Sequence, residues 1–330
     1  MPIDVVFSNS ANSAAHLEWG QADALSASSD MPAACPYCGS SDNTLYCRGR
    51  AAVILRCHNC GGFYDPNREG EITPDGTAID QVTREYLSSY RDDESSELAI
   101  ARNVVTLLCE RVPSATRFLE FGCGNAAIGQ VAAADRLPIT YTGIELSPAL
   151  YAAISPDLRN RILHEPTLKS ALDRVPNGSQ DIVILHHVLE HLPDPRDSLA
   201  LLRQKLAAEG RFFIEVPNEQ WKRRIMGLRR TLKPSGDDWF PGHINFFTQT
   251  SLRNFLAAQG FEIEYERKVT AASYPEMVKK MLGGESKFRA SPVARMVYAG
   301  LRWSKLESLI GYGIVLRCLC RPSAPNATHE

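Results

Sequence analysis

The residues best suited to chemistry lie in the stretch HHVLEHLPDP, residues 186–195. It places three histidines and one glutamate within six positions. Histidine exchanges a proton near neutral pH, and imidazole and carboxylate groups also bind metal ions. If the stretch formed a helical turn, His187, Glu190 and His191 would share one face, and His186 would point elsewhere. The stretch therefore predicts a general base or substrate-orienting group, a metal site, or a hydrogen-bonded structural turn, and the residues alone leave all three open.

Two Cys-x-x-Cys pairs near the N-terminus form a second reactive group. Eighteen residues separate the pairs, and glycine follows each pair directly. Two tight turns that each present two thiolates can supply the four ligands of tetrahedral Zn²⁺. Because four cysteines leave no open coordination position, we expect a structural zinc rather than four reduced core cysteines. The predicted ligands are Cys35, Cys38, Cys57 and Cys60, and Cys47 is predicted to be a spectator.

A glycine loop and a later glutamate predict a nucleotide-binding site. In FLEFGCGNAAIG, an apolar strand passes into a helix through Gly122 and Gly124, which let the backbone approach a ligand closely. Glu145 ends the next strand, in YTGIELSP, where a carboxylate can accept hydrogen bonds from both hydroxyls of a ribose. The glycine loop alone is a weak signal, and the pair of features is much stronger.

Alternating strands and helices must position these groups. From residue 117 onward, predicted strands alternate with predicted helices; the strands are RFLEFG, TYTGIEL, RILHE, DIVILHH and RFFIEVP, and the helices run through AIGQVAAAD, near PALYAAI and over DSLALLRQKLAAEG. This order is the signature of a parallel sheet with helices on both faces. The strand DIVILHH then carries the histidines to the carboxyl edge of the sheet, where ligands bind in open α/β folds.

These motifs resemble the class I S-adenosylmethionine-dependent methyltransferases over residues 83–270. LEFGCG resembles the first motif of that family, GIELSP its acidic second strand, and DIVILHHVLEHLPDP its fourth strand and following turn. Ala126 replaces a third glycine of the family's loop. The resemblance implies an α/β fold with a Rossmann-like, mostly parallel sheet and an antiparallel last strand. It also implies S-adenosyl-L-methionine as the cofactor, bound by Glu120, Gly122, Cys123, Gly124, Glu145, Leu146 and His186.

A nicotinamide-dependent dehydrogenase is the rival for the same glycine loop. Such an enzyme would carry a third glycine spaced for pyrophosphate, but position 127 is alanine. The later motifs also favour the methyl donor.

The histidine stretch further resembles the Glu-x-x-Glu-His motif that, with a distant histidine, holds a divalent metal in ubiquinone-pathway and small-RNA-terminal O-methyltransferases. His187 stands in place of the first glutamate, and His243, in PGHINFFT, matches the distant histidine. Because Mg²⁺ prefers oxygen ligands, this substitution favours Zn, Mn or Fe for any second metal at the active site. The candidates for catalysis are therefore His187, Glu190, His191 and His243, with the last two preferred as base or as metal ligand.

Charge and composition bound the partners. The chain has 330 residues, a formal net charge of −2 and a pI near 6.5, so no overall attraction draws it to nucleic acid. No apolar run approaches the roughly 18 residues that span a bilayer. We therefore expect a cytoplasmic protein without a membrane span. The basic segment QWKRRIMGLRRTLKPSGDDWFP could form a lid over an anionic or sugar-linked small-molecule acceptor, or a solvated basic helix.

The favoured activity is O-methylation of a small-molecule or sugar-type acceptor. The methyl group of a sulfonium is already activated, so the protein must mainly align a nucleophile and exclude water. A neutral imidazole could take the proton of an acceptor hydroxyl. The alternatives are an RNA methyltransferase and a non-catalytic protein that only binds the cofactor.

The expected domain organisation has four parts. Residues 1–31 are predicted to be a flexible tail, and residues 32–66 a zinc-ribbon-like unit with one apolar strand, Ala52 to Leu55, between the cysteine pairs. Residues 83–321 are predicted to form the methyltransferase domain. It should begin with two helices in residues 83–112, carry insertions at 219–242 and 274–309, and end in an antiparallel strand within YGIVLRCLCRP. Residues 322–330 form a second tail.

Overall fold

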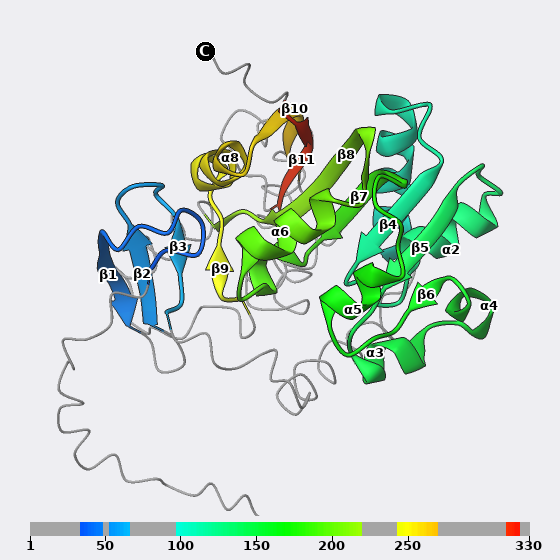
Figure 1. Ribbon diagram of the computed structural model, residues 1–330, viewed down its shortest axis with the longest axis horizontal. Coiled ribbons are helices and arrows are strands. Elements are labelled where there is room, and N and C mark those ends of the chain that lie inside the picture. The colour runs from blue at the N-terminus through cyan, green and yellow to red at the C-terminus, as the bar shows by residue number, and fades with distance from the viewer. Residues whose placement is uncertain (1–33, 49–52, 67–96, 220–242, 270–314, 324–330) are drawn as a thin grey trace, which may run out of the picture. The chain divides into compact units, whose positions relative to one another are not determined.

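The structure, a computed structural model, describes residues 34–48, 53–66, 97–219, 243–269 and 315–323. Within these ranges, seven strands form one sheet in the order β10-β11-β8-β7-β4-β5-β6 (Figure 1). The strands are β4 (Arg117–Phe121), β5 (Thr140–Ile144), β6 (Ile162–Leu163), β7 (Gln180–His186), β8 (Leu206–Pro217), β10 (Phe261–Val269) and β11 (Val315–Pro322). Parallel pairing runs from β6 through β5, β4 and β7 to β8. The predicted Rossmann-like sheet is confirmed.

The last strand of the chain enters the sheet inside its edge. β11 lies between β8 and β10 and is antiparallel to both. The predicted closing antiparallel strand is therefore confirmed, and the edge position belongs to β10. Residues 270–314, between these two strands, include the predicted insertion at 274–309 and lie outside the described residues.

The central strands are apolar on both faces because both faces are covered. In β7, Ile182 and Ile184 belong to one buried cluster together with Phe118 of β4. Val183 and Leu185 point to the opposite cluster, which also contains Leu119, with all four β7 side chains fully buried. A strand buried on both faces reads as a continuous hydrophobic run, and this explains the sequence DIVIL.

Helices connect the strands and cover the sheet (Figure 1). A helix spans residues 97–111, and it is followed along the chain by α2 (Ala127–Ala134), α3 (Pro148–Ala153), α4 (Pro156–Arg159), α5 (Leu168–Asp173), α6 (Pro195–Arg203) and α8 (Gln249–Ala258). Residues 83–96, which hold the first of the two helices predicted at the start of the domain, lie outside the described residues. Among the described helices, none has the length and apolar character needed to cross a membrane.

The predicted helix over DSLALLRQKLAAEG is too long. α6 ends at Arg203, and β8 already begins at Leu206. The carbonyls of Gln204 and Lys205 accept hydrogen bonds from the backbone of Gly178 and Gln180, at 2.9 Å each. These bonds hold residues 204–205 beside the start of β7, so the chain turns into the sheet instead of continuing the helix.

A second, smaller sheet contains the cysteine pairs. Its order is β1 (Asn43–Arg48), β2 (Val53–Cys57), β3 (Phe63–Tyr64) and β9 (Asn245–Phe246), with antiparallel pairing throughout. We call residues 34–48 and 53–66 the Cys ribbon. The apolar strand predicted between the cysteine pairs, Ala52 to Leu55, corresponds to β2, whereas β1, which also lies there, was not predicted. β1 is an edge strand that leaves Leu45 55% exposed, so its sequence lacks a buried apolar run.

Candidate active site

Strand register brings four chemical groups into one row at the carboxyl edge of the large sheet. Phe121 pairs with Leu185, so Gly122 and His186 follow at neighbouring strand ends. His186 pairs with Glu215 on β8, and Glu215 pairs with Arg317 on β11. The glycine loop, the histidines and a buried ion pair therefore face the same edge of the sheet.

The glycine loop adopts left-handed backbone conformations. Gly122 and Gly124 have φ of 67° and 55°, values that favour glycine. A Cβ atom built on Gly122 would lie 2.7 Å from Cγ2 of Val188. The first glycine therefore allows the loop to pass directly against the turn that follows β7. Ala126 also has a positive φ, 58°, at the start of α2, where the family pattern has glycine.

Glu145 ends β5 beside this loop. Its two carboxylate oxygens accept hydrogen bonds from the backbone N–H groups of Gly124, at 2.9 Å, and Ser147, at 2.8 Å. Burial raises the pKa of this carboxyl, and the backbone hydrogen bonds oppose the rise. Its backbone carbonyl lies 2.8 Å from Nδ1 of His164, whose ring stacks on Tyr151. These contacts thus fix the Glu145 carboxylate against the glycine loop.

Glu120, at the end of β4, is held differently. Its side chain is 3% exposed and accepts a short hydrogen bond from the hydroxyl of Tyr141. Burial raises the pKa of Glu120 to about 8, while the bond from Tyr141 opposes the rise. This carboxyl is therefore largely protonated at neutral pH, unlike an acid that faces water.

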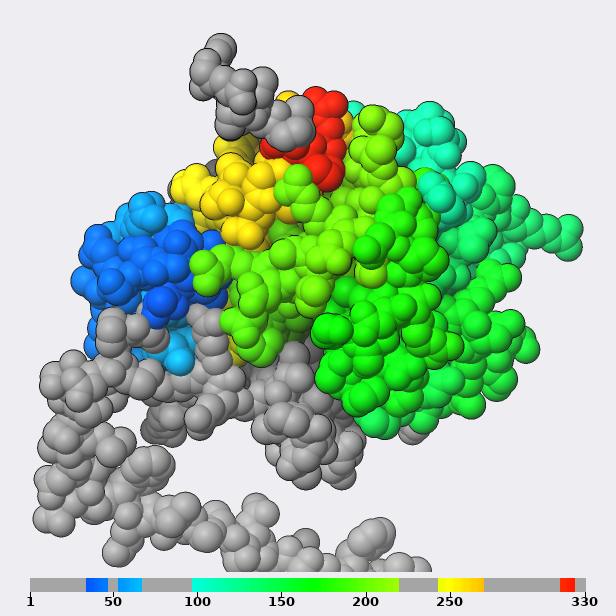
Figure 2. All heavy atoms as spheres, in the orientation of Figure 1, coloured from blue at the N-terminus to red at the C-terminus, as the bar shows by residue number. Residues whose placement is uncertain are grey.

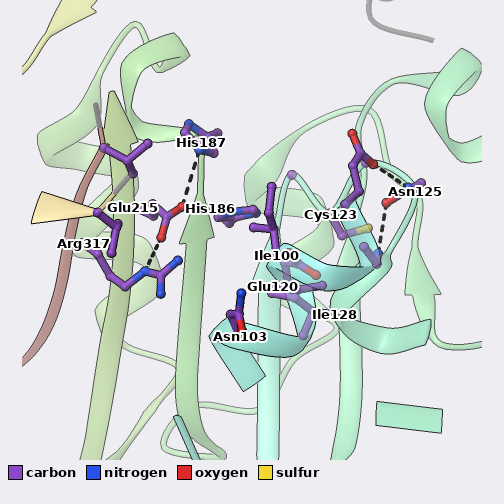
Figure 3. Close-up of a pocket in the computed structure, with 17 residues that line it drawn as sticks. Ile100, Asn103, Glu120, Cys123, Asn125, Ile128, His186, His187, Glu215 and Arg317 are labelled. Carbon is purple, nitrogen blue, oxygen red and sulfur yellow. Dashed lines mark hydrogen bonds and ion pairs between the residues drawn. The ribbon is translucent and has the colours of Figure 1, made fainter. Parts of the chain in front are cut away.

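A cavity of about 430 Å³ joins the glycine loop to the row of charged groups. Figure 3 shows Cys123 and Asn125 on one side of this cavity and Glu215 on the other, with Glu215 between His187 and Arg317. The helix at residues 97–111 contributes Ile100 to the wall. The cavity therefore has a side suited to a cofactor and a side suited to a second molecule.

Glu215 is the centre of the charged side. Its carboxylate lies 3.3 Å from Nε2 of His186 and 3.6 Å from Nε2 of His187, and it pairs closely with Nε of Arg317. The prediction that His186 points away from His187 was wrong, because both rings approach the same carboxylate. Burial opposes the charge of Glu215, but its histidine partners outweigh burial and hold its pKa well below the ordinary value.

The sequence spacing predicted that His187 forms a helical turn with Glu190 and His191. The structure shows that it does not. It has a φ of 56°, and its backbone N–H donates to the carbonyl of Glu215 at 2.9 Å. This bond continues the pairing of β7 with β8 by one residue. The 3₁₀ turn that follows covers only Leu189–His191. Strand pairing therefore prevents residue 187 from entering the turn.

His187 is held as a cation between two carboxylates. Its Nδ1 lies 3.3 Å from Oε1 of Glu190, and its Nε2 faces Glu215. Burial lowers the pKa of His187, but Glu190 and Glu215 outweigh it and raise that pKa to about 10. A protonated imidazole cannot accept a proton. His187 therefore places positive charge at the wall of the cavity, with its two ring nitrogens facing carboxylates, and it is not suited to act as a base.

Glu190, His191 and His243 form a second cluster, in which one possible ligand atom from each residue lies within 4.8 Å of the others. The rings of His191 and His243 meet edge to face, with centroids 4.8 Å apart. Nδ1 of His243 lies 3.9 Å from the carboxylate of Glu219, which is too far for a hydrogen bond but close enough for the two charges to attract each other when the histidine is protonated. Burial opposes ionisation of Glu190, but His187, His191 and His243 lower its pKa to about 2.

The predicted residues thus fall into two adjoining groups. His186 and His187 line the cavity, together with the predicted cofactor residues Glu120, Gly122, Cys123 and Gly124. Glu145 lies next to them through Gly124, and Leu146 is half-buried after it. His191 and His243 meet in the second cluster, and Glu190 joins the two groups. Sequence reasoning missed Glu215, Arg317 and Glu219; the one available signal was an acidic residue near the end of the apolar strand RFFIEVP.

The four predicted zinc ligands come together in the Cys ribbon. All four sulfur atoms lie within 4.8 Å of one another. The Sγ atoms of Cys35 and Cys60 are 3.5 Å apart, and those of Cys38 and Cys57 are 3.6 Å apart. Tetrahedral Zn²⁺ with bonds of about 2.3 Å requires sulfur atoms separated by about 3.8 Å. A hydrogen bond from Cys60 lowers the pKa of Cys35 to about 6 despite its burial. These residues fit Zn²⁺.

Comparisons with known proteins agree with this geometry. A family model described as a methyltransferase domain matches residues 90–266. The mitochondrial ubiquinone biosynthesis O-methyltransferase of Schizosaccharomyces pombe is 27% identical over 169 residues, which cover 47% of this chain and 58% of that protein. The matched region is thus less than two thirds of that relative.

The solved structures to which the chain is similar include methyltransferases. The plantazolicin methyltransferase BamL is 13% identical, with a TM-score of 0.48, over 73% of this chain and 91% of that one. An S-adenosylmethionine-dependent methyltransferase from Archaeoglobus fulgidus is 18% identical, with a TM-score of 0.42, over 67% and 93% of the two chains.

Proposed function

Since the chain belongs to the methyltransferase domain family, as a class I S-adenosylmethionine-dependent methyltransferase, we propose that it methylates an oxygen of a small-molecule acceptor. The observation that carries this proposal is the glycine loop, which Glu145 holds through the backbone N–H of Gly124 and which lines one side of a cavity whose other side holds histidines. The similarity to an O-methyltransferase of ubiquinone biosynthesis supports oxygen as the acceptor atom.

The cofactor would occupy the side of the cavity formed by the glycine loop. Glu145 would accept hydrogen bonds from the ribose hydroxyls. Gly122 and Gly124 would allow the backbone to approach the ligand. The cofactor supplies an electrophilic methyl group on a sulfonium. Glu120, His186 and Leu146 complete our assignment of this half of the site. We place the adenine near the segment from Glu165 to Leu168, which directly follows β6 and His164.

The acceptor would lie against the charged side of the cavity. His187, held protonated by Glu190 and Glu215, can place positive charge near an acceptor oxygen and stabilise negative charge on it. Arg317 holds Glu215 from the opposite side. A small acceptor with an acidic hydroxyl or another anionic group suits this arrangement. The predicted basic lid, at residues 220–241, lies outside the described residues.

A base can come from the second cluster. His191 and His243 are in contact with each other, and His243 faces the Glu219 carboxylate, which would stabilise an imidazolium after proton transfer. The same cluster supports a second reading, in which Glu190, His191 and His243 hold a divalent metal. Two imidazoles and one carboxylate suit Zn, Mn or Fe better than Mg²⁺. Oε2 of Glu190 is buried and has no hydrogen-bond partner among the described residues, which is expected of an oxygen that binds a cation.

Two measurements test the proposed function. Calorimetric titration with S-adenosylhomocysteine should show one binding site per chain. Transfer of labelled methyl groups should then be screened in pools of phenolic quinone precursors, nucleotide-sugars, lipids and RNA, and we expect label in a small-molecule pool. Binding without transfer to any pool would favour a non-catalytic cofactor-binding protein. Label in RNA alone would replace the small-molecule proposal.

A further inference from the structure

The Cys ribbon and the second histidine cluster are joined by one short strand. β9 consists of Asn245 and Phe246, and it starts two residues after His243. One of its edges pairs with β3 of the ribbon, in the register Phe63↔Phe246 and Tyr64↔Asn245. In addition, the backbone N–H of Asp65 donates to the carbonyl of Ile244 at 2.9 Å. The chain next to His243 is therefore part of the ribbon's sheet.

The same short strand holds the 3₁₀ turn that carries Glu190 and His191. The side-chain amide of Asn245, 2% exposed, donates to the carbonyls of Leu189, at 3.1 Å, and Leu192, at 2.7 Å. The backbone N–H of Ile244 donates to the carbonyl of Glu190 at 3.0 Å. Ile244 and Asn245 thus hold the turn through these hydrogen bonds. The same two residues also pair with the Cys ribbon at Tyr64 and Asp65.

Tyr37 connects this strand to the cysteines. It lies between Cys35 and Cys38, and it is fully buried. Its hydroxyl donates to the carbonyl of Phe63 at 2.7 Å and accepts from the backbone N–H of Phe246 at 3.0 Å. Its ring packs on Phe247, with centroids 4.9 Å apart. One side chain therefore bonds to both paired strands, and its backbone position is set by the two neighbouring cysteines.

The second cysteine pair makes a matching contact. The carbonyl of Cys60 accepts a hydrogen bond from the side-chain amide of Asn254, on α8, at 3.1 Å. A Cβ atom on Gly62 would lie 2.1 Å from the ring of Tyr37, so the backbone here is shaped around that ring. The first cysteine pair thus contacts β9 through Tyr37, and the second pair contacts α8 directly.

We infer that the Cys35/Cys38/Cys57/Cys60 centre is part of the scaffold of the active site, with Tyr37 and Asn245 as positioning residues. Through them, the state of the centre fixes the relative placement of Glu190, His191 and His243. The inference rests on the proposed function only for the effect on turnover. The structural link itself can be measured without an acceptor.

The test uses the full chain, with Tyr37→Phe as the main variant and Tyr46→Phe as its matched control. Tyr37→Phe keeps the ring but removes both hydroxyl hydrogen bonds. Tyr46 lies on β1, and its ring contacts Phe63 in the same small sheet. For each protein we would measure bound zinc, affinity for S-adenosylhomocysteine, and the ring resonances of the histidines by NMR, assigned with single substitutions. A fourth sample is wild-type protein from which the zinc has been removed by a thiol reagent and a chelator.

We expect Tyr37→Phe to retain one zinc and full affinity for S-adenosylhomocysteine, while the resonances of His191 and His243 shift. His164, which stacks on Tyr151 beside Glu145, should stay unchanged as the internal reference. Zinc removal should shift the same two histidines further. With an acceptor in hand, turnover of Tyr37→Phe should fall about tenfold at unchanged cofactor affinity, and Tyr46→Phe should match the wild type.

Two results would overturn the inference. One is that the resonances of His191 and His243 remain at their wild-type positions in both Tyr37→Phe and the zinc-free protein. The other is that His164 shifts as much as they do, because the effect would then be general unfolding and not a directed link. Neither result depends on methyl transfer. Failure of the proposed function would appear separately, as a lack of S-adenosylhomocysteine binding.

Discussion

Oε1 of Glu190 lies 3.3 Å from Nδ1 of His187, and this contact joins the two groups of histidines. On one side, His187 and His186 share Glu215 at the cavity. On the other, Glu190 meets His191 and His243. Because the Glu190 side chain is 1% exposed, its charge acts on both groups with little screening by water. The acceptor side and the candidate base are therefore coupled through a single carboxylate.

Removing the negative charge of Glu190 should slow the reaction without weakening cofactor binding. Glu190→Gln keeps the shape of the side chain but leaves His187 with one carboxylate. We expect turnover to fall by about one to two orders of magnitude and the affinity for S-adenosylhomocysteine to change little. Steady-state kinetics and calorimetry check this. Glu209→Gln, at a carboxylate on β8 that is 90% exposed, is a control that removes a charge outside the cluster. Equal turnover of Glu190→Gln and wild type would contradict the assigned role.

The two alternatives for the second cluster, a histidine base and a divalent metal site, differ in what restores activity. His191→Ala and His243→Ala should each lower turnover with cofactor binding nearly intact. If a metal acts, a chelator that leaves the zinc of the cysteine centre bound should inactivate the wild type, and Mn²⁺ should restore it. If a histidine is the base, such a chelator has no effect, and the acidic limb of the pH-rate profile disappears in the variant. Wild-type rates in both variants would show that the cluster is only structural.

Cofactor affinity should depend on Glu145. Glu145→Ala removes the carboxylate that two backbone N–H groups hold at the end of β5. We expect binding of S-adenosylhomocysteine to weaken by about 10- to 100-fold, because charge-assisted hydrogen bonds to ribose are lost. Glu262→Ala, which removes an exposed partner of Arg321, serves as the control. Unchanged affinity in Glu145→Ala would mean that the ribose binds elsewhere.

The glycine loop offers a comparison that separates backbone strain from contact. Gly122 and Gly178 have nearly the same φ, 67° and 68°, but only a Cβ on Gly122 would meet a neighbour, Val188, within 4 Å. Both alanine variants should lose about 1 kcal/mol or more from the unfolding free energy through strain. Gly122→Ala alone should also weaken S-adenosylhomocysteine binding and lower turnover. Denaturant unfolding measures the loss of stability, and calorimetry measures the binding of S-adenosylhomocysteine. Equal cofactor binding by both variants would contradict a role for the close contact between residue 122 and Val188.

The cysteine centre should bind one zinc per chain. Cys57→Ser should abolish stoichiometric zinc and lower the unfolding temperature by several degrees, because folding and metal binding are coupled. Cys109→Ser is the control, since Cys109 is a half-buried residue of the helix at 97–111 and lies outside the centre. Metal analysis and thermal unfolding give the answer. Zinc-free wild-type protein that unfolds at the same temperature as zinc-loaded wild-type protein would show that the ion contributes nothing.

Glu120 should make stability depend on pH. Its pKa is about 8 in the folded protein against an ordinary 4.5. Between these values the folded state keeps a proton that the unfolded state releases, so the unfolding free energy is greatest below about pH 4.5 and falls up to about pH 8. The slope from this group is at most about 1.4 kcal/mol per pH unit. Glu120→Gln should flatten this part of the profile, whereas Glu262→Gln should leave it unchanged.

Much of the fold followed from local patterns. The apolar run DIVIL and the loop EFGCG predicted a buried strand and a strand-to-helix turn, because each pattern lies within a few consecutive residues. The pairing of Glu145 with the loop followed from the regular spacing of a strand-helix-strand unit. The four cysteines were found for the same reason, since metal ligands come in short, spaced pairs.

The rest depends on contacts between distant segments. Glu215 and Arg317 are 102 positions apart in sequence, and only the register of β8 with β11 brings them together. The placement of His187 was mispredicted because one backbone hydrogen bond to Glu215 overrides the helical spacing. The role of Tyr37 depends on a two-residue strand more than two hundred positions away. No local pattern encodes such pairings.

The position of β11 also sets the order in which the molecule can be assembled during translation. The five parallel strands and the Cys ribbon precede residue 218 and can begin to pair as they leave the ribosome. β10 then emerges before β11, its neighbour among the described strands of the sheet, has been synthesised. Until residues 315–322 arrive, β8 has an open edge and the buried Glu215 lacks its arginine. The nascent chain therefore exposes an unpaired strand late in synthesis, and that is where a chaperone would be most needed.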